Sequence, residues 1–304
     1  MDQIQLKAYG KINLGLDVLG KRPNGYHDVR MIMQTVQLFD RLDMRKIKED
    51  DIHLKTNLSY VPCNEQNLVY KAVELLRREF QIKEGLSIQL EKHIPVAAGM
   101  AGGSTDCAAA LYGMNRLFSL NLTTKQLMEY GVQLGADVPY CIMRGTALSE
   151  GIGEILTRLS PMPNCYILIA KPAISVSTRF VYENLKLQQL EGRPDIDGMI
   201  LALKQKDLEG ITKRLANVLE TVTIPHYPII AEIKEQMNKT GAMNSLMSGS
   251  GPTVFGIYND LETAKNALFA MRRSRLARQT YLVEPFNMMI PESNFSKKMS
   301  KSSC

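Results

Sequence analysis

The stretch KHIPVAAGMAGGSTDCAAALYGMNRLF, residues Lys92–Phe118, decides how the rest of the chain is organised. Just before it, residues 86–91 alternate between apolar and polar side chains, which is typical of a half-buried strand. From Cys107 to Phe118, apolar residues recur at helical spacing on one face, with Asp106 on the other face. The stretch therefore predicts a strand, a turn rich in glycine, and a helix.

The turn contains Gly99, Gly102 and Gly103, followed by Ser104 and Thr105. Glycine permits positive φ angles and close approach of the backbone, so several N–H groups can point into one hollow. The start of the following helix adds its own unpaired N–H groups and its dipole. This arrangement predicts a cradle for a polyphosphate. On the glycines alone, a tight turn without a ligand explains the composition equally well, and the pattern is neither a P-loop nor a dinucleotide-binding fingerprint.

The composition of the 304 residues is that of an ordinary globular protein, with 45% hydrophobic and 22% charged residues, enough for one large or two modest domains. The net charge of +6 suits an enzyme with anionic substrates. The basic runs carry no interleaved aromatic residues, which favours a solvated face over nucleic-acid binding. We therefore expect no nucleic-acid partner.

The cysteines and the apolar runs indicate the cellular compartment in which the protein is expected. Five cysteines, an odd number without Cys-x-x-Cys spacing, indicate neither a zinc site nor a disulfide framework, so a reducing cytoplasm is expected. No apolar run approaches the length that spans a bilayer, and the first predicted strand begins within a few residues of Met1, which leaves no room for a signal peptide.

The first predicted strand, residues 3–18, brings polar side chains into a regular pattern. Its alternation places Lys11, Asn13 and Asp17 on one face. The opposite face carries Ile12, Leu14, Leu16 and Val18. Composition alone favours a solvent-facing lysine here. A turn at residues 23–25 follows and precedes Tyr26 and His27, which in isolation read as surface residues.

Two further polar residues stand at predicted helix boundaries. Asn67 precedes a helix beginning at Leu68 and is expected to cap it. Asp137, in Gly-Ala-Asp-Val-Pro, follows a predicted helix that begins at a capping box of Thr123 and Gln126. Taken alone, Asp137 is more often a turn or cap residue than a catalytic one.

The chain is expected to change domain near residues 161–164. We predict an N-terminal domain of residues 1–160, a C-terminal domain of residues 161–290, and a disordered tail of residues 291–304. The second domain is expected to contain a buried strand over residues 165–170. Its predicted helices cover residues 196–206, 208–219, 227–239 and 261–272, and a glycine loop, MSGSGPTVF, occupies residues 247–255 between two short strands.

The central stretch resembles the Pro-x-x-x-Gly-Leu-Gly-Ser-Ser-Ala signature of the GHMP kinases. Lys-x-Asn at residues 11–13, Gly-Ala-Asp-Val-Pro and the second glycine loop also match that family, in the same order, and the resemblance extends over roughly residues 6–286. Residues 22–27, Arg-Pro-Asn-Gly-Tyr-His, resemble the corresponding segment in the branch of the family that acts on cytidine diphosphate methylerythritol. The departures from the family pattern are small. Met100 stands in place of the usual Leu, Ala98 and Ala101 stand where some members have Gly, and Thr105 stands in place of the second Ser.

The resemblance implies an α+β, two-domain GHMP kinase fold. Its N-terminal domain would hold a mixed or antiparallel sheet with helices, and its smaller C-terminal domain would be ferredoxin-like. The implied activity is that of an ATP-dependent small-molecule kinase with an alcohol acceptor, which phosphorylates the 2-hydroxyl of the methylerythritol unit in non-mevalonate isoprenoid biosynthesis. The implied cofactors are ATP and Mg²⁺, and the partner is a small molecule.

Site residues follow from the matching positions. Asp137 would accept the hydroxyl proton, and Lys11 would lower the pKa of that carboxylate and stabilise developing charge. Ser104 or Thr105 would supply a hydroxyl to Mg²⁺. The expected ATP-binding residues are Asn67, Lys92, Pro95, Val96, Ala97, Ala98, Gly99, Met100, Ala101, Gly102, Gly103, Ser104 and Thr105. The expected substrate-binding residues are Asn13, Tyr26, His27, Asp137, Thr178, Tyr182, Gly249 and Ser250.

Three functions remain open at this point. Residues 22–27 and Tyr182 favour the kinase that acts on the cytidine-bearing alcohol. A GHMP kinase for another small alcohol, such as homoserine or a mevalonate derivative, would need no cytidine site. A nucleotide-binding or nucleic-acid-binding protein that lost catalysis is the third, and Lys11 and Asp137 argue against it. The chain is expected to act as a monomer or a homodimer, away from membranes.

Overall fold

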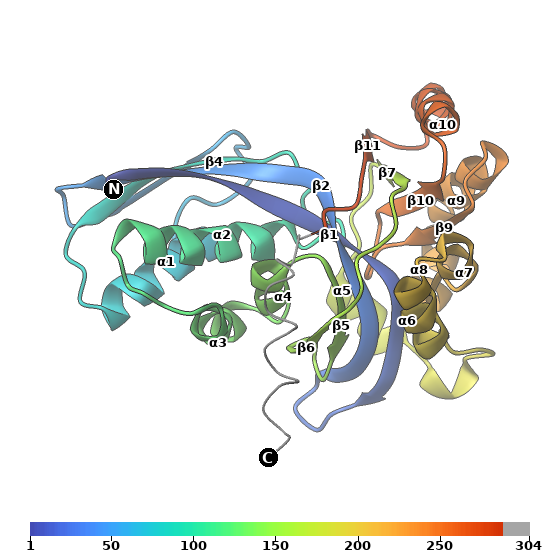
Figure 1. Cartoon of the computed structure of the whole chain (residues 1–304), viewed down its shortest axis with the longest axis horizontal. Helices are drawn as coiled ribbons and strands as arrows, with labels where there is room; N and C mark the ends of the chain where they lie inside the picture. The colour runs from blue at the N-terminus through green and yellow to red at the C-terminus, as the bar shows by residue number, and fades with distance from the viewer. Residues whose placement is uncertain (288–304) are drawn as a thin grey trace, which may run out of the picture.

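The computed structural model describes residues 1–287, and its first half is built on a mixed seven-stranded sheet (Figure 1). The order is β3-β4-β2-β1-β8, with β5 on β2 and β6 on β5, and only the β3–β4 and β1–β8 pairs are parallel. The strands are β1 (Gln3–Lys21), β2 (His27–Ile47), β3 (Ile52–Thr56), β4 (Gly85–Glu91), β5 (Thr146–Glu150), β6 (Ile155–Arg158) and β8 (Ala216–Asn217).

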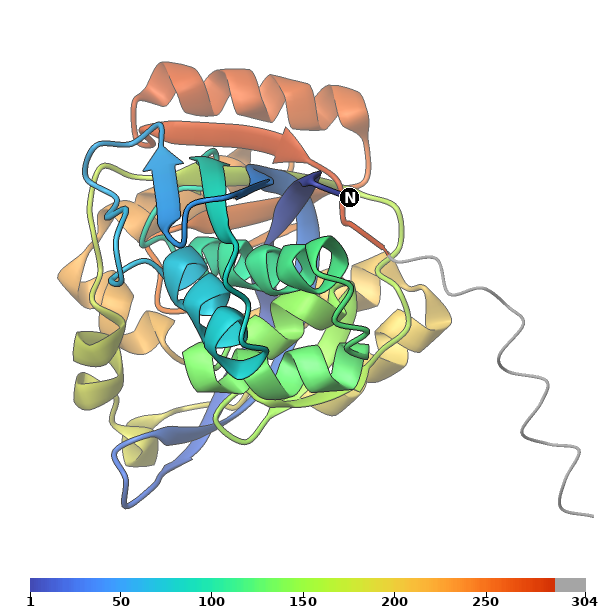
Figure 2. The same ribbon diagram turned by 90° about the vertical axis from the view of Figure 1, so that its left-hand side faces the viewer.

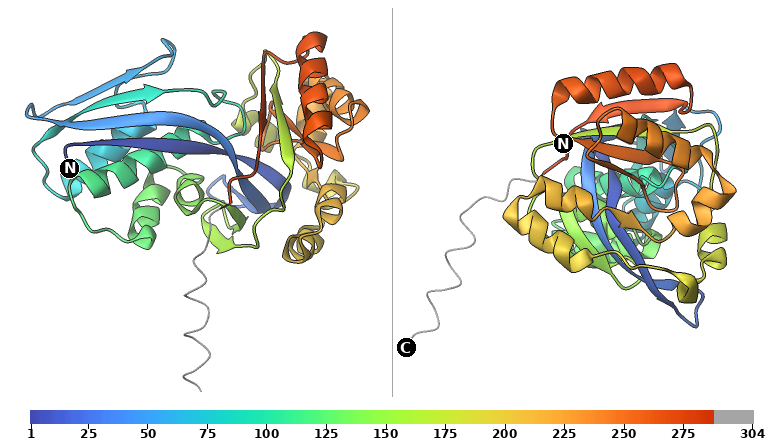
Figure 3. Two further views of the ribbon diagram at one scale, coloured as in Figure 1. Left: turned by 45° about the horizontal axis from the view of Figure 1, so that its top comes forward. Right: turned by 90° about the vertical axis from the view of Figure 1, so that its right-hand side faces the viewer.

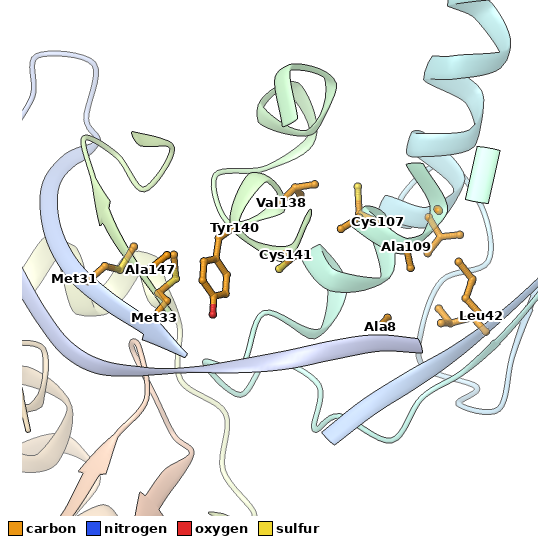
Figure 4. Packing of buried hydrophobic residues seen from close by; sticks show 14 of the residues in the cluster. Ala8, Met31, Met33, Leu42, Cys107, Ala109, Val138, Tyr140, Cys141 and Ala147 are labelled. Atoms are coloured by element: carbon orange, nitrogen blue, oxygen red, sulfur yellow. The ribbon is translucent and has the colours of Figure 1, made fainter. Parts of the chain in front are cut away.

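Four helices cover one face of this sheet (Figure 1): α1 (Leu68–Glu79), α2 (Gly102–Leu117), α3 (Thr124–Leu134) and α4 (Val138–Met143). The predicted caps are confirmed. The Asn67 side chain accepts a hydrogen bond from the N–H of Val69, and Thr123 and Gln126 form the expected capping box. Figure 4 shows the core between α2, α4 and the sheet, with Tyr140, Val138 and Cys107 packed over Ala8 and Met33.

The second half contains a four-stranded antiparallel sheet of order β11-β7-β10-β9. Its strands are β7 (Tyr166–Lys171), β9 (Asn244–Met247), β10 (Val254–Tyr258) and β11 (Gln279–Val283). The helices are α5 (Thr178–Asn184), η1 (Leu187–Gln189), α6 (Ile196–Gln205), α7 (Leu208–Lys213), α8 (Glu220–His226), α9 (Ile229–Lys239) and α10 (Leu261–Ser274). Helices α9 and α10 lie on the side of this sheet away from α1 and α2 (Figure 3). This strand order confirms the expected ferredoxin-like arrangement.

Strands β1 and β2 form a long hairpin whose turn projects from the body (Figure 2). The regular alternation predicted for β1 is wrong beyond Asn13, because an extra residue between Asn13 and Gly15 shifts the register with β2. Leu14 accordingly belongs to one hydrophobic cluster and Leu16 to another. Asp17 therefore does not share a face with Lys11, and it pairs instead with Arg193.

The helix predicted over residues 208–219 is wrong, because it is interrupted after α7. The chain there extends into β8, which pairs with β1 at Gly15 and Leu16 before α8 begins. Strand pairing with a distant segment thus overrides local helical spacing. The division of the chain at residue 160 stays a prediction, and the predicted tail of residues 291–304 lies outside the described residues. Within residues 1–287, no helix is both long enough and apolar enough to cross a membrane.

Candidate active site

Strand β1 contributes two polar side chains that the fold has buried. The ammonium of Lys11 donates a hydrogen bond to Oδ1 of Asn13 over 2.6 Å, and the two residues are 5% and 0% exposed. The solvent-facing interpretation of Lys11 is therefore wrong. The backbone N–H of Lys11 also donates to the carbonyl of Met100 over 3.1 Å, which joins this strand to the glycine-rich turn before α2.

We call that turn, residues 95–101, the first glycine loop. Its backbone takes positive φ at Ala97, Gly99 and Ala101, so the left-handed conformation expected of glycine falls partly on alanine. Gly102 and Gly103 are instead the first residues of α2. Among residues 1–287, no side chain caps this helix. Its first N–H groups are thus left for a ligand with negative charge.

The remaining loop residues differ in exposure. Pro95, Ala98 and Met100 are buried, whereas Val96 and Ala97 are exposed. Exposed backbone is where a bound phosphate could approach. The buried positions instead fix the loop against the rest of the protein.

The two hydroxyls at the start of α2 have different surroundings. Thr105 is 2% exposed, and its hydroxyl donates to the carbonyl of Tyr9 over 2.8 Å. Ser104 is partly exposed, and within the described part of the chain its hydroxyl has no hydrogen-bond partner. Ser104 is therefore the hydroxyl that is available to a ligand.

The glycine loop predicted over residues 247–255 occupies residues 248–253 between β9 and β10; we call it the second glycine loop, and it touches the first loop directly. The hydroxyl of Ser248 donates to the carbonyl of Gly99 over 2.9 Å. A Cβ placed on Gly99 would lie 2.1 Å from the carbonyl oxygen of Ser248, and a Cβ on Gly249 would lie 3.6 Å from Oδ1 of Asn13. Asn13, Gly99 and Gly249 thus meet at one point.

Two residues that sequence reasoning missed hold the second loop and the end of β9 that precedes it. The Asn217 amide donates to the carbonyls of Met247 and Gly249, over 2.9 and 2.8 Å, and its Oδ1 accepts from the N–H of Leu219. A carboxylate oxygen of Glu220 accepts from the N–H of Met247 over 2.8 Å. The sequence around Asn217 reads as helix, so no local signal pointed to this role.

Asp137 stands at the start of α4, which Tyr140 anchors. The Tyr140 hydroxyl donates to the carbonyl of Gly145 over 2.7 Å and lies 3.0 Å from the Thr35 hydroxyl. The Asp137 side chain makes no capping hydrogen bond, so its carboxylate is available. Among the described residues it forms no ion pair with Lys11 within 4.0 Å.

Lys11 and Asp137 nonetheless both affect the pKa of the same buried thiol, that of Cys141. Burial raises the pKa of the Cys141 thiol well above its usual range; the charge of Asp137 raises it further, and that of Lys11 lowers it. Burial also raises the pKa of Tyr182, to which the Asp137 carboxylate adds. Asp137 therefore lies within electrostatic reach of both Cys141 and Tyr182.

Helix α5 and the β1–β2 hairpin supply an aromatic pair. The rings of His27 and Tyr182 lie 5.1 Å apart between centroids. Burial, with the charge of Lys21, lowers the pKa of His27, so its imidazole is neutral near pH 7. The Thr178 hydroxyl lies 2.8 Å from that of Ser250, which connects α5 to the second loop. Tyr26 is 57% exposed beside the hairpin turn, outside this aromatic pair.

Two residues expected at the nucleotide have polar groups engaged elsewhere. Both ends of the Asn67 amide bind the backbone, one at Val69 and the other at Pro62. The Lys92 ammonium lies between the carboxylates of Asp40 and Asp106. The structure gives Asn67 a capping role and Lys92 a buried ion-pair role, and a contact of either with a nucleotide stays a prediction.

The chain is similar to known proteins of one family. Models of the GHMP kinase N-terminal and C-terminal domains match residues 67–145 and 199–277. Two curated proteins named 4-diphosphocytidyl-2-C-methyl-D-erythritol kinase, from Lachnospira eligens and Lachnoclostridium phytofermentans, are 57% and 56% identical over 286 residues. These alignments cover 94% of this chain and 99% and 98% of the relatives.

Solved structures give the same picture. A crystal structure of 4-(cytidine 5'-diphospho)-2C-methyl-D-erythritol kinase aligns with a TM-score of 0.81 and 28% identity, over 94% of this chain and 100% of the other. A homoserine kinase from Cytophaga hutchinsonii aligns with a TM-score of 0.78 at 19% identity, over 94% and 95% of the two chains, which shows a common fold alone. The chain belongs to the 4-diphosphocytidyl-2-C-methyl-D-erythritol kinases of the GHMP kinase family.

Proposed function

We propose that this protein transfers the γ-phosphoryl group of ATP to the 2-hydroxyl of 4-diphosphocytidyl-2-C-methyl-D-erythritol, a step in non-mevalonate isoprenoid precursor synthesis. The observation that carries the proposal is that Asn13, Gly99 and Gly249 meet at one point, while the Thr178–Ser250 contact joins the second loop to α5, which carries Tyr182 of the His27–Tyr182 pair. A phosphate cradle and an aromatic pair on one site suit a substrate with a nucleoside at one end and an alcohol at the other. The three free buried cysteines suit a reducing cytoplasm.

The ATP side of the site uses backbone groups. N–H groups of the first glycine loop and of the first turn of α2 bind the phosphates, because the helix dipole favours negative charge there. In phosphoryl transfer the transition state is loose, so the protein mainly positions the reactants and stabilises charge. The Lys11 ammonium, held by Asn13, contributes that charge from the floor of the site.

The acceptor side depends on Asp137. Its carboxylate makes no capping bond and accepts the proton of the attacking hydroxyl as the bond to phosphorus forms. A neutral His27 and the Tyr182 ring contact the cytosine, one through its edge and the other through its face. The Thr178 and Ser250 hydroxyls lie next to each other and can bind polar groups of the same substrate.

A magnesium ion fits the donor set. Within residues 1–287, no three or more His, Cys, Asp and Glu residues form a group that could hold a metal. Mg²⁺ in kinases needs no such cage, since one or two protein oxygens plus substrate phosphates and water complete its shell. Ser104 is the hydroxyl that would hold it, because that of Thr105 is engaged with Tyr9. When bound, the ion neutralises phosphate charge.

The test is ADP release with Mg²⁺-ATP across four alcohols: 4-diphosphocytidyl-methylerythritol, methylerythritol phosphate, homoserine and mevalonate. Turnover confined to the cytidine-bearing compound is expected. Equal turnover of homoserine or mevalonate would keep the kinase fold but contradict the role given to His27 and Tyr182. No turnover of any alcohol, with the nucleotide still bound, would contradict the catalytic proposal.

A further inference from the structure

A cluster of three charged side chains lies buried behind the first glycine loop. The ammonium of Lys92 contacts Oδ2 of Asp40 and, over 2.5 Å, Oδ2 of Asp106. The three residues are 7%, 0% and 2% exposed, so water does not screen them. Sequence patterning had put Asp106 on the polar face of α2, and its burial corrects that expectation.

Each member of the cluster belongs to an element that fixes one part of the loop. Lys92 directly follows β4, Asp40 lies on β2, and Asp106 lies on the first turns of α2. Oδ1 of Asp40 accepts hydrogen bonds from the N–H groups of His93 and Ile94, which precede the loop. The loop is thereby tied at its start by Asp40 and at its end by Asp106.

The contact with α2 is close. A Cβ on Gly102 would lie 3.3 Å from Nζ of Lys92 and 3.2 Å from Cγ2 of Ile94. The first residue of α2 therefore rests on the ammonium and on the residue that Asp40 holds. Lys92 is therefore linked to the start of α2 by its ion pair with Asp106 and by its position beside Gly102, so a change at Lys92 is expected to shift the helix start that receives the phosphates.

Charge balance makes Lys92 the member on which both carboxylates depend. Burial lowers the pKa of Lys92, but the charges of Asp106 and Asp40 raise it above its usual value, so the ammonium persists. Burial raises the pKa of Asp106 well above its usual range. Its Oδ1 has no hydrogen-bond partner among the described residues. Removing Lys92 leaves two buried carboxylates without a counter-ion, which costs more than breaking an exposed pair, whereas removing one carboxylate leaves Lys92 paired with the other.

We infer that Lys92, Asp40 and Asp106 act as positioning residues for the phosphate cradle, and that Lys92 serves ATP binding through loop geometry rather than by touching the nucleotide. This inference rests on the proposed function for the identity of the ligand. It predicts that substitution of Asp40, which is fully buried and out of reach of any ligand, weakens ATP binding as much as substitution of Lys92 does.

The experiment compares Lys92→Met, Asp40→Asn and the double variant with wild type in the full-length protein. The readouts are the KM for ATP, the Kd for ADP by calorimetry, and hydrogen exchange of residues 95–101 without nucleotide. Lys55→Met is the matched control, since Lys55 is an exposed lysine on β3, the strand that pairs with β4. Circular dichroism checks folding.

Both single variants are expected to raise the KM for ATP about tenfold or more, because a displacement of about 1 Å in a positioning element is costly. The KM of the double variant for ATP should be no higher than that of the single variant with the higher KM, since the two residues form one unit. Exchange in residues 95–101 should accelerate in all three, and Lys55→Met should behave as wild type. Should Asp40→Asn fail to fold, Asp106→Asn replaces it; its effect is expected to be smaller and in the same direction, because the Asp106 carboxylate binds Lys92 whereas that of Asp40 also holds two backbone N–H groups.

A higher KM in Lys92→Met, with Asp40→Asn and loop exchange unchanged, would overturn the inference and place Lys92 on the nucleotide. Unchanged binding and exchange in both variants would overturn it too. Loop exchange and ADP binding need no acceptor alcohol. They therefore test this inference even if wild-type protein phosphorylates none of the four compounds, which would be a failure of the proposed function alone.

Discussion

Replacing Gly99 with alanine is expected to force the two glycine loops apart. The added Cβ would lie 2.1 Å from the carbonyl oxygen of Ser248, while ordinary contact begins at 3.4 Å, so the loops must separate by about 1.3 Å. That movement breaks the hydrogen bond from the Ser248 hydroxyl to the Gly99 carbonyl. Alanine at a φ of +73° also carries backbone strain on the order of 1–2 kcal/mol.

A shift of this size in a site that positions reactants costs about a hundredfold in rate, so kcat/KM should fall by roughly that factor. The free energy of unfolding should fall by about the strain, on the order of 1–2 kcal/mol. Steady-state ADP release with the cytidine-bearing substrate measures the first quantity, and urea unfolding measures the second.

Gly192→Ala is the matched control for this substitution. Gly192 does not have a positive φ, and a Cβ there meets nothing within 4 Å. Its kcat/KM should stay within about threefold of wild type, a small free-energy change. If Gly99→Ala also stays within about threefold, contact between the loops is not required for turnover and the reasoning fails.

Four further substitutions separate the roles assigned to individual side chains. Asp137→Asn should lower kcat by about two to four powers of ten, the usual range for a lost acid or base, and near-normal kcat in steady-state assays would remove Asp137 from the chemistry. Ser104→Ala should lower turnover and raise the Mg²⁺ concentration required, whereas Thr105→Val should mainly reduce the unfolding free energy by about 1 kcal/mol through loss of the bond to Tyr9. The reverse pattern in Mg²⁺ titrations would exchange their roles. Tyr182→Leu should raise the KM for the cytidine-bearing substrate about tenfold and leave the KM for ATP unchanged; a rise in the ATP KM alone would contradict the cytosine contact.

The parts of the fold that follow from local rules were predictable. Asn67 and Thr123 cap helices because a short polar side chain reaches an N–H two or three residues ahead. All the residues that form such a cap are close in sequence, so the cap can be recognised there. The strand before the first glycine loop shows the same dependence on local alternation. The ferredoxin-like order of the second sheet was expected from family resemblance rather than from these rules.

The misses share one cause, which is contact between segments far apart in the chain. Lys11 looks exposed by alternation, but the first glycine loop covers it through Met100. Residues 208–219 look helical, but pairing of β8 with β1 extends them and presents Asn217 to the second loop. Local spacing carries no information about such partners.

The glycines of the first loop and of the start of α2 show the same limit, because each glycine there has different physical surroundings. Gly99 must lack a side chain so that the Ser248 carbonyl can approach, whereas a Cβ on Gly102 would press on Lys92 and Ile94 and require them to shift by a few tenths of an ångström. Gly103 is exposed, and a Cβ there would meet nothing closer than a Leu68 methyl at 3.7 Å, which leaves room for a ligand. Ala97 and Ala101 take the positive φ that glycine would adopt more easily. Conformational freedom alone therefore does not explain where glycine occurs in this loop and at the start of α2. Close packing against distant segments also determines these positions.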